Sequence, residues 1–200
     1  PLLGAPAHDP ARLLAFAEGF RTPDHGWARA PGLAAGSLSA TFLATLIEEI
    51  LAGSPTRPGE VQAFLIGRRR GNGFAEDPDS PGNGANTLAA AAILAHLLGL
   101  GEVAQDAASR LLALRLPDSG WPAFAGLKAD LLSTATACAA LDDMGFLNDR
   151  AREDALAFAL SCERDSGGFG AVPDDPGTAP EYVFHGLTVL ALGGPTRPSP

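Results

Sequence analysis

Two side chains in the C-terminal third of the chain could act as metal ligands or as acid–base groups. Asp130 comes directly before an alanine-rich apolar run, and His185 follows Phe184 at the start of another. Asp130 can cap a helix, with its carboxylate at the positive helix end, or it can have a chemical role, and the two uses are compatible. His185 is either a packed histidine with one hydrogen bond or a ligand. These residues alone leave both questions open.

Other charged residues and the two cysteines allow a similar choice. The run Arg68-Arg69-Arg70 could bind a diphosphate, although basic residues at a helix C-terminus also offset the helix dipole. The acidic loops at 76–79 and 174–175 are interpreted as solvated. Cys138 and Cys162 are too few for a disulfide framework, so they predict reduced thiols in a cytoplasmic protein.

A glycine followed by an aromatic residue recurs almost evenly along the chain. The aromatic residues are separated by 47, 47 and 48 residues, and a fixed period of this size is typical of a repeat architecture. We interpret the rings mainly as packing between neighbouring repeats. The four pairs are Gly26-Trp27, Gly73-Phe74, Gly120-Trp121 and Gly168-Phe169.

Helical patterns flank each of these pairs. Leu131, Thr134, Ala135, Cys138 and Leu141 recur at helical spacing in the third repeat, and we find no alternating run that would predict strands. Small apolar residues dominate the helices expected at 37–52, 84–100, 130–146 and 180–192, which suits an inner layer. More charged helices, suited to an outer layer, are expected at 10–20, 59–69, 103–116 and 149–162. The sequence therefore predicts one all-α domain over residues 1–200, with four helical hairpins.

The composition excludes several classes of protein. The chain has 200 residues, 46% hydrophobic and 18% charged, as in soluble globular proteins. Its net charge of −9 argues against binding to nucleic acid or to an anionic membrane. The most apolar run, 87–100, contains His96 and is shorter than the roughly 20 residues of a spanning helix, so no transmembrane segment is expected.

Three C-terminal segments together resemble the β subunits of protein prenyltransferases, in particular the geranylgeranyl-transferring kind. They are 130–141 (DLLSTATACAAL), 162–177 (CERDSGGFGAVPDDPG) and 182–192 (YVFHGLTVLAL). The earlier repeats share only the Gly-aromatic spacing with that family. The resemblance implies an α/α toroid, here a partial barrel or horseshoe, whose central cavity holds an isoprenoid diphosphate.

The resemblance also implies site residues. In that family an Asp, a Cys two residues later and a distant His hold a zinc ion that activates a substrate thiol. Asp130 and His185 match the first and third positions as metal-binding and catalytic residues, whereas Leu132 occupies the cysteine position and cannot ligate. Cys138 lies six residues along the helix from Leu132, about 240° away around the axis.

The related proton-initiated terpene cyclases are a weaker match. They use an Asp-x-Asp-Asp-Thr-Ala run as an acid, and Leu132 replaces its middle aspartate here as well. Further ligand-binding candidates are Lys128 for the diphosphate and Tyr182, Trp121 and Phe169 for the isoprenoid.

Three functions remain in view: a prenyltransferase-like enzyme, a non-catalytic toroid that binds an isoprenoid-like lipid, and a scaffold for protein interaction. The N-termini of four inner helices on one rim would favour a diphosphate. Four hairpins could leave an open horseshoe, which predicts either a helical partner subunit or a homodimer that closes the ring.

Overall fold

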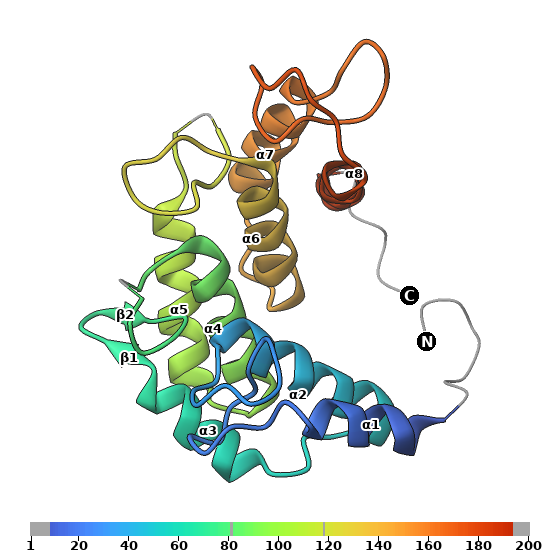
Figure 1. Cartoon of the computed structure of the whole chain (residues 1–200). Helices are drawn as coiled ribbons and strands as arrows, with labels where there is room; N and C mark the ends of the chain where they lie inside the picture. The colour runs from blue at the N-terminus through green and yellow to red at the C-terminus, as the bar shows by residue number, and fades with distance from the viewer. Residues whose placement is uncertain (1–8, 81, 118, 194–200) are drawn as a thin grey trace, which may run out of the picture.

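The computed structural model describes residues 9–80, 82–117 and 119–193, which form eight α-helices and one short β-hairpin. Figure 1 shows the helices as an arc running from α1 and α2 through α4 and α6 to α8. The domain ends that the sequence predicts, at 1–8 and 194–200, lie outside the described residues. The helices are α1 (Pro10–Glu18), α2 (Leu38–Ala52), α3 (Pro58–Gly67), α4 (Ala85–Leu97), α5 (Gly101–Leu114), α6 (Leu131–Asp143), α7 (Asp149–Ser161) and α8 (Pro180–Gly193).

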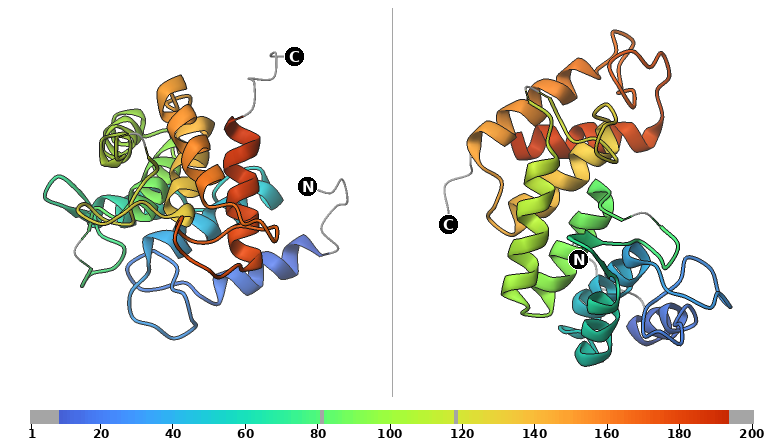
Figure 2. Two further views of the ribbon diagram at one scale, coloured as in Figure 1. Left: turned by 90° about the horizontal axis from the view of Figure 1, so that it is seen from above. Right: turned by 90° about the vertical axis from the view of Figure 1, so that its left-hand side faces the viewer.

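The helices lie in two layers, as the sequence predicts. Along the inner side, α2, α4, α6 and α8 pack against one another in chain order. On the outer side, α3 packs on α4, α5 on α4 and α6, and α7 on α6 and α8 (Figures 1 and 2). The four hairpins and their order are therefore confirmed. Within the described ranges, no helix has the length and apolar character needed to cross a bilayer.

Short polar side chains set where several helices begin. Ser37 accepts a hydrogen bond from the Ala40 amide at 3.1 Å, and Asn148 accepts one from the Ala151 amide at 2.9 Å. Such caps satisfy amides that the first helical turn leaves unpaired and contribute about 1 kcal/mol each. Gly53 ends α2 in a left-handed conformation, at φ 80°, which glycine adopts without steric penalty.

Each repeated aromatic residue lies between two helices, in a segment that folds back onto the preceding outer helix; Phe74 is in the short strand β2 (Gly73–Phe74). The residue after the aromatic donates its amide hydrogen to a carbonyl at the end of that helix, except after Trp121, where Pro122 has no amide hydrogen. The equivalent bonds run from Ala28 to Phe20, from Ala75 to Arg68 and from Gly170 to Cys162, each at 2.9 Å.

A second set of backbone hydrogen bonds joins one repeat to the next. The first residue of an inner helix donates its amide hydrogen to a carbonyl two residues after the aromatic of the following repeat. The loop of each repeat thereby caps the inner helix before it and fixes the register between hairpins. These bonds run from Leu38 to Glu76 at 2.8 Å, from Ala85 to Ala123 at 2.9 Å and from Leu131 to Ala171 at 2.8 Å.

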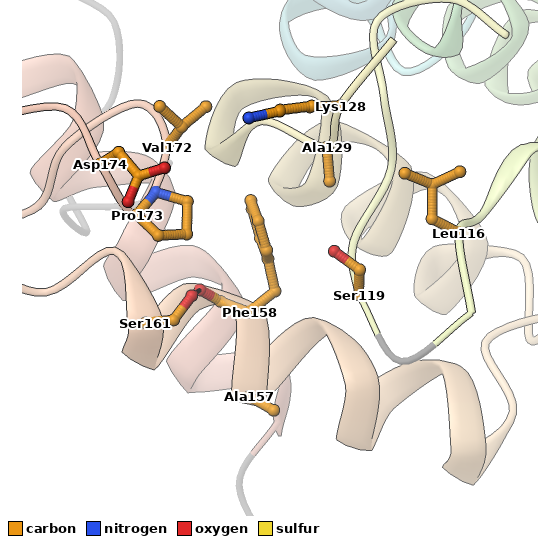
Figure 3. A pocket seen from close by; sticks show the side chains of 10 residues that line it. All are labelled: Leu116, Ser119, Lys128, Ala129, Ala157, Phe158, Ser161, Val172, Pro173 and Asp174. Atoms are coloured by element: carbon orange, nitrogen blue, oxygen red, sulfur yellow. Dashed lines mark hydrogen bonds between the residues drawn. The ribbon is translucent and has the colours of Figure 1, made fainter. Parts of the chain in front are cut away.

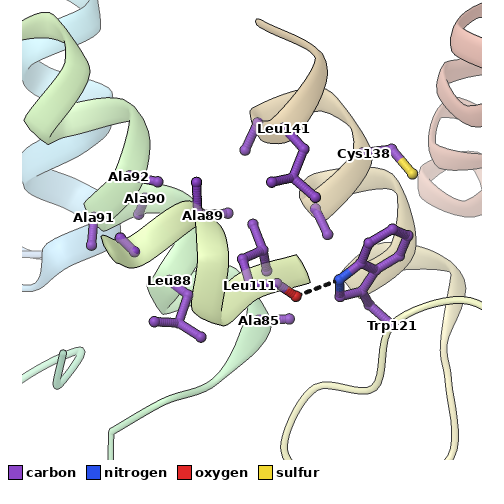
Figure 4. Packing of buried hydrophobic residues seen from close by; sticks show 14 of the residues in the cluster. Ala85, Leu88, Ala89, Ala90, Ala91, Ala92, Leu111, Trp121, Cys138 and Leu141 are labelled. Carbon is purple, nitrogen blue, oxygen red and sulfur yellow. Dashed lines mark hydrogen bonds between the residues drawn. The ribbon is translucent and has the colours of Figure 1, made fainter. Parts of the chain in front are cut away.

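Small residues allow the inner helices to approach closely. The alanines of α4 are almost all buried between its neighbours, and Trp121 fills the space between α5 and α6 (Figure 4). The Trp121 indole N–H donates to the Leu111 carbonyl at 2.7 Å. Gly120 is required beside it, because a Cβ there would lie 2.1 Å from the Thr134 hydroxyl oxygen.

The expectation that the chain contains no strands is wrong at one place. β1 (Arg69–Arg70) pairs antiparallel with β2 (Gly73–Phe74) around a turn in which Gly71 has φ 51°. Two-residue strands are too short for an alternating pattern, so the sequence gives no sign of them. The adjacent Arg68 is buried, and its guanidinium donates to Asp24 at 2.5 Å and to the Gly36 carbonyl at 2.7 Å.

Candidate functional site

Asp130 is the N-cap of α6. One carboxylate oxygen accepts a hydrogen bond from the Ser133 amide at 2.8 Å, and the Asp130 amide donates to the Trp121 carbonyl at 3.1 Å. The side chain is half-buried where the third repeat meets the fourth. Capping is therefore confirmed as one of its two predicted uses, and its second carboxylate oxygen has no hydrogen-bond partner within the described ranges.

His185 lies on α8, half-buried, with its ring 5.4 Å from that of Phe184. Burial lowers the pKa of His185 from 6.5, and the nearby charges of Glu181 and Asp130 partly oppose this shift. The imidazole is consequently neutral at pH 7. Asp130 and His185 are thus close enough to interact electrostatically, although no hydrogen bond joins them in the described part of the chain.

A third group near Asp130 is Cys162, which sequence reasoning did not place at the site. It follows α7 and is fully buried, and burial raises the pKa of its thiol. The Asp130 charge raises it further, whereas Ser161 and Arg164 oppose the shift. Cys162 is therefore a protonated thiol at neutral pH. The only sequence signal for its position is its place five residues before the first glycine of the Gly-Gly-Phe motif.

The described residues do not fit a zinc centre. No three His, Cys, Asp or Glu side chains among them come together as metal ligands. Leu132 is 37% exposed on the first turn of α6 and offers no donor atom. Cys138 is buried on a different side of α6 from Leu141 (Figure 4), and burial raises the pKa of its thiol to about 12. The predicted ligand set is accordingly limited to Asp130 and His185.

Lys128 lines a cavity of about 460 Å³ at the rim of the arc, which we call the rim cavity (Figure 3). The ring of Phe158 forms part of its wall, and the hydroxyl of Ser161 donates to the Phe158 carbonyl at 2.6 Å. Lys128 is exposed and has no ion-pair partner among the described residues. The carboxylate of Asp174 lines the same cavity, so an anion bound there would be attracted by Lys128 and repelled by Asp174. The cavity is surrounded by Leu116, Ser119, Lys128 and Ala129, by residues 172–174 and by the end of α7.

The three aromatic candidates lie in different surroundings. Trp121 is fully buried, and its amide donates to the Thr134 hydroxyl at 3.0 Å. Phe169 is 5% exposed and packs directly under Gly186 of α8, where a Cβ would lie 2.6 Å from the ring. These two rings belong to the packing between hairpins and line neither cavity described in this section. Tyr182 is half-buried in the first turn of α8.

One stripe of α4 and α6 is left exposed by their helical neighbours. The other sides of both helices contact adjacent inner helices and the outer layer, so we infer that this stripe faces the open, concave side of the arc (Figure 1). Most of its side chains are apolar or uncharged. We call Ile93, Leu97, Leu132, Thr136 and Ala139 the concave stripe; all five are partly or fully exposed.

An apolar groove of about 760 Å³ lies at the other end of the molecule, between α1 and α2. Phe16 of α1 and Leu43, Ile47 and Ile50 of α2 line it, and they are 70%, 54%, 39% and 63% exposed. Exposed apolar groups gathered in this way mark a binding surface more often than an ordinary protein surface. We call it the α1–α2 groove.

Comparisons with known proteins identify the fold. No family model matches the chain, and neither does any curated protein. The chain is similar to protein geranylgeranyltransferase-I of Candida albicans complexed with GGPP, with a TM-score of 0.67, 18% identity, and 78% of this chain and 49% of that chain covered. It is also similar to ent-copalyl diphosphate synthase from Streptomyces platensis, with a TM-score of 0.75 and 24% identity. In this match 98% of this chain and 38% of the synthase chain are covered.

A third solved structure is the type II terpene cyclase MstE from Scytonema, as a variant in complex with geranylgeranyl dihydroxybenzoate. Its TM-score is 0.70 at 19% identity, with 90% of this chain and 55% of that chain covered. The chain therefore has the α/α-toroid fold of these prenyltransferases and terpene cyclases, as the sequence predicts. It spans about half of the length of the geranylgeranyltransferase and MstE chains, and less of the synthase.

Proposed function

We propose that the protein binds an isoprenoid-type lipid against the concave stripe, with an anionic head group beside Lys128. The observation that carries this proposal is the position of Leu132. At the place where a metal ligand or a catalytic acid would be needed, an apolar side chain is exposed on the concave side. Lys128, four residues earlier, lines the rim cavity. An exposed apolar side chain, Leu132, and a cation, Lys128, are thus close together in the sequence.

The energetics suit a long apolar tail. Burying about 200 Å² of apolar surface contributes about 5 kcal/mol before the entropy of binding is subtracted. A diphosphate would interact favourably with Lys128, while the net charge of −9 opposes it. Charges farther away than about 8–10 Å are screened at physiological salt, so the groups that line the cavity, Lys128 and the opposing Asp174, have the larger influence. Two of the solved structures of this fold contain geranylgeranyl compounds, which supports the same ligand class.

Zinc-dependent transfer of the prenyl group is the second candidate, favoured by the electrostatic proximity of Asp130 and His185. Zinc would need a third protein ligand, and Leu132 provides none. We expect the purified protein to contain no stoichiometric zinc and the variant Leu132→Cys to bind it, since a thiolate would then stand two residues after Asp130. Zinc at one equivalent in the unmodified protein would favour the enzyme over the binding protein.

Calorimetry with geranylgeranyl diphosphate and with the neutral alcohol geranylgeraniol tests the proposal. We expect saturable binding of the diphosphate, and Leu132→Asp should weaken the binding of both ligands at least about tenfold, because it places a charge against the apolar tail. Lys128→Ala should weaken binding of the diphosphate alone. Leu160→Asp is the matched control, since Leu160 is 49% exposed on the outer helix α7.

Two results would contradict the proposal. One is the absence of saturable binding by the unmodified protein. The other is an equal loss of binding in Leu132→Asp and in Leu160→Asp, because an effect shared by both faces cannot arise from contact with the concave stripe.

A further inference from the structure

The two ends of the inner layer expose positions that all the other inner helices bury. Counting from the first residue of each inner helix, Ile47 of α2 is equivalent to Leu94, Ala140 and Val189. Those three are 0%, 3% and 1% exposed, because each packs toward the preceding inner helix, whereas Ile47 is 39% exposed. The α1–α2 groove is therefore the surface on which an inner helix would pack.

The opposite end of the array shows the complementary pattern. Leu187 of α8 is equivalent to Thr45, Ala92 and Cys138. These three are 0%, 0% and 1% exposed, because each packs toward the following inner helix, whereas Leu187 is 55% exposed. The surface of α8 that carries Leu187 is thus the kind that packs on a groove such as the one between α1 and α2.

These two surfaces are complementary, because equivalent surfaces pack against each other inside the chain. The same pair of faces meets three times within the chain, between α2 and α4, α4 and α6, and α6 and α8. Among the described residues, 9–80, 82–117 and 119–193, one copy of each face is left without a helical neighbour, at opposite ends of the arc. A second copy of this chain would supply both partners, because its α8 carries the kind of face that packs on an inner helix.

Charge at the rim favours this pairing. Across the first seam between repeats, the side chain of Glu76 accepts hydrogen bonds from the amide and the hydroxyl of Ser39, the second residue of α2. The residue equivalent to Glu76 in the first repeat is Arg29, and the second residue of α8 is Glu181. A seam between two copies would accordingly place a cation next to an anion.

One backbone contact would differ at that seam. The Arg29 carbonyl is equivalent to those that accept a hydrogen bond from the next inner helix, and it has no partner among the described residues. Pro180, the first residue of α8, has no amide hydrogen to donate. The seam between copies therefore lacks one hydrogen bond that the internal seams have, which makes it weaker than they are.

We propose that two copies associate head to tail, each α8 packing in the α1–α2 groove of the other, to close the arc into a ring. Because the interface is heterologous, it closes only if the rotation per copy allows it. The inference rests on the register of the helices and is independent of the ligand proposed in the preceding section.

Mass measurement on mixed variants tests the seam. Light scattering after gel filtration should give a dimer for the unmodified protein and monomers for Ile47→Asp and for Leu187→Asp, each of which damages both seams. An equimolar mixture of the two variants should recover dimers, because one undamaged groove can then meet one undamaged α8. Ile66→Asp is the control, since Ile66 is 42% exposed on the outer helix α3. All three residues are exposed, so the variants should fold, and circular dichroism checks this.

Several outcomes would overturn the proposal. The unmodified protein could be a monomer at all concentrations, or its mass could keep growing with concentration, which excludes a closed pair. Failure of the mixture to recover dimers would also overturn it, because a groove-to-groove interface gives no rescue. If the groove holds the lipid instead, Ile47→Asp will abolish binding of geranylgeranyl diphosphate in a protein that is monomeric throughout.

A charge exchange tests the register of the seam. Arg29→Glu and Glu181→Arg should each raise the dissociation constant of the dimer about two- to fivefold, which is the range for an exposed ion pair. The double variant should restore the original dissociation constant. Arg29 also pairs with Glu76 at 2.7 Å, so thermal unfolding is measured alongside to separate that contribution. No recovery in the double variant would exclude the proposed register.

Discussion

Replacing Asp130 separates its role as a helix cap from its charge. Alanine removes both the hydrogen bond from the Ser133 amide and the negative charge at the N-terminus of α6, whereas asparagine keeps a capping oxygen and removes only the charge. Loss of a cap costs about 1 kcal/mol, and the charge contributes about 0.3–1 kcal/mol more. We therefore expect Asp130→Ala to be destabilised by about 1.5 kcal/mol and Asp130→Asn by about 0.5 kcal/mol.

Thermal unfolding followed by circular dichroism measures this difference. In a domain of this size 1 kcal/mol corresponds to about 2–4 °C in Tm, so Asp130→Ala should melt about 3–6 °C lower and Asp130→Asn about 1–2 °C lower. The NMR titration of His185 is a second readout, because the Asp130 charge raises its pKa. Both variants should lower that pKa further.

Two results would refute this reasoning. Equal destabilisation in the two variants would mean that the charge, and not the cap, stabilises α6. An unchanged His185 pKa would mean that the two side chains do not interact, which would also remove the observation that favours a zinc site.

Three further predictions concern packing and protonation. Gly120→Ala should lower the free energy of unfolding by about 1–3 kcal/mol, because the new Cβ would meet side chains of α6 and α7. In Gly59→Ala the new Cβ meets nothing within 4 Å, so denaturant unfolding should show no such loss of stability. Cys138 and Cys162 should resist a thiol reagent in the native protein and react once it is unfolded, since burial raises both pKa values; rapid native labelling would contradict this. The pKa of His185 in the folded protein lies below 6.5, so the unfolded chain binds the proton first and the free energy of unfolding falls as the pH falls through 6.5. Urea unfolding of His185→Gln should show a smaller loss of stability over this pH range. A loss equal to that of the unmodified protein would contradict the lowered pKa.

The repeat pattern is why so much of the fold could be predicted from the sequence. Glycine is needed before the ring at 121 because the loop lies against Thr134, and the ring itself fills the space between helices. The spacing of these pairs therefore reports the spacing of hairpins. Helix starts were close to those observed because Ser37 and Asp130 are strong caps.

The surroundings of the candidate site were harder to predict, because they depend on how one repeat is rotated relative to the next. Cys162 is 32 residues from Asp130 in sequence, and only the packing of the fourth hairpin brings the Cys162 thiol within range of the Asp130 charge. The burial of Arg68 depends on Asp24, which lies in a different repeat. Local pattern carries no information about either pairing.

The difference between a preserved fold and an altered site follows from where each is stabilised. The seams depend on backbone hydrogen bonds such as Leu131 to Ala171 and on small buried residues, none of which involves the concave stripe. The residue at position 132 can therefore vary without disturbing the hairpins, because the side chain of Leu132 is 37% exposed. An exposed leucine on the concave side gains stability only if something apolar covers it. The lipid that we propose, enclosed if two arcs close on each other as we propose, would provide that cover. The composition of the concave stripe and the exposed faces at the ends of the array would then have one explanation.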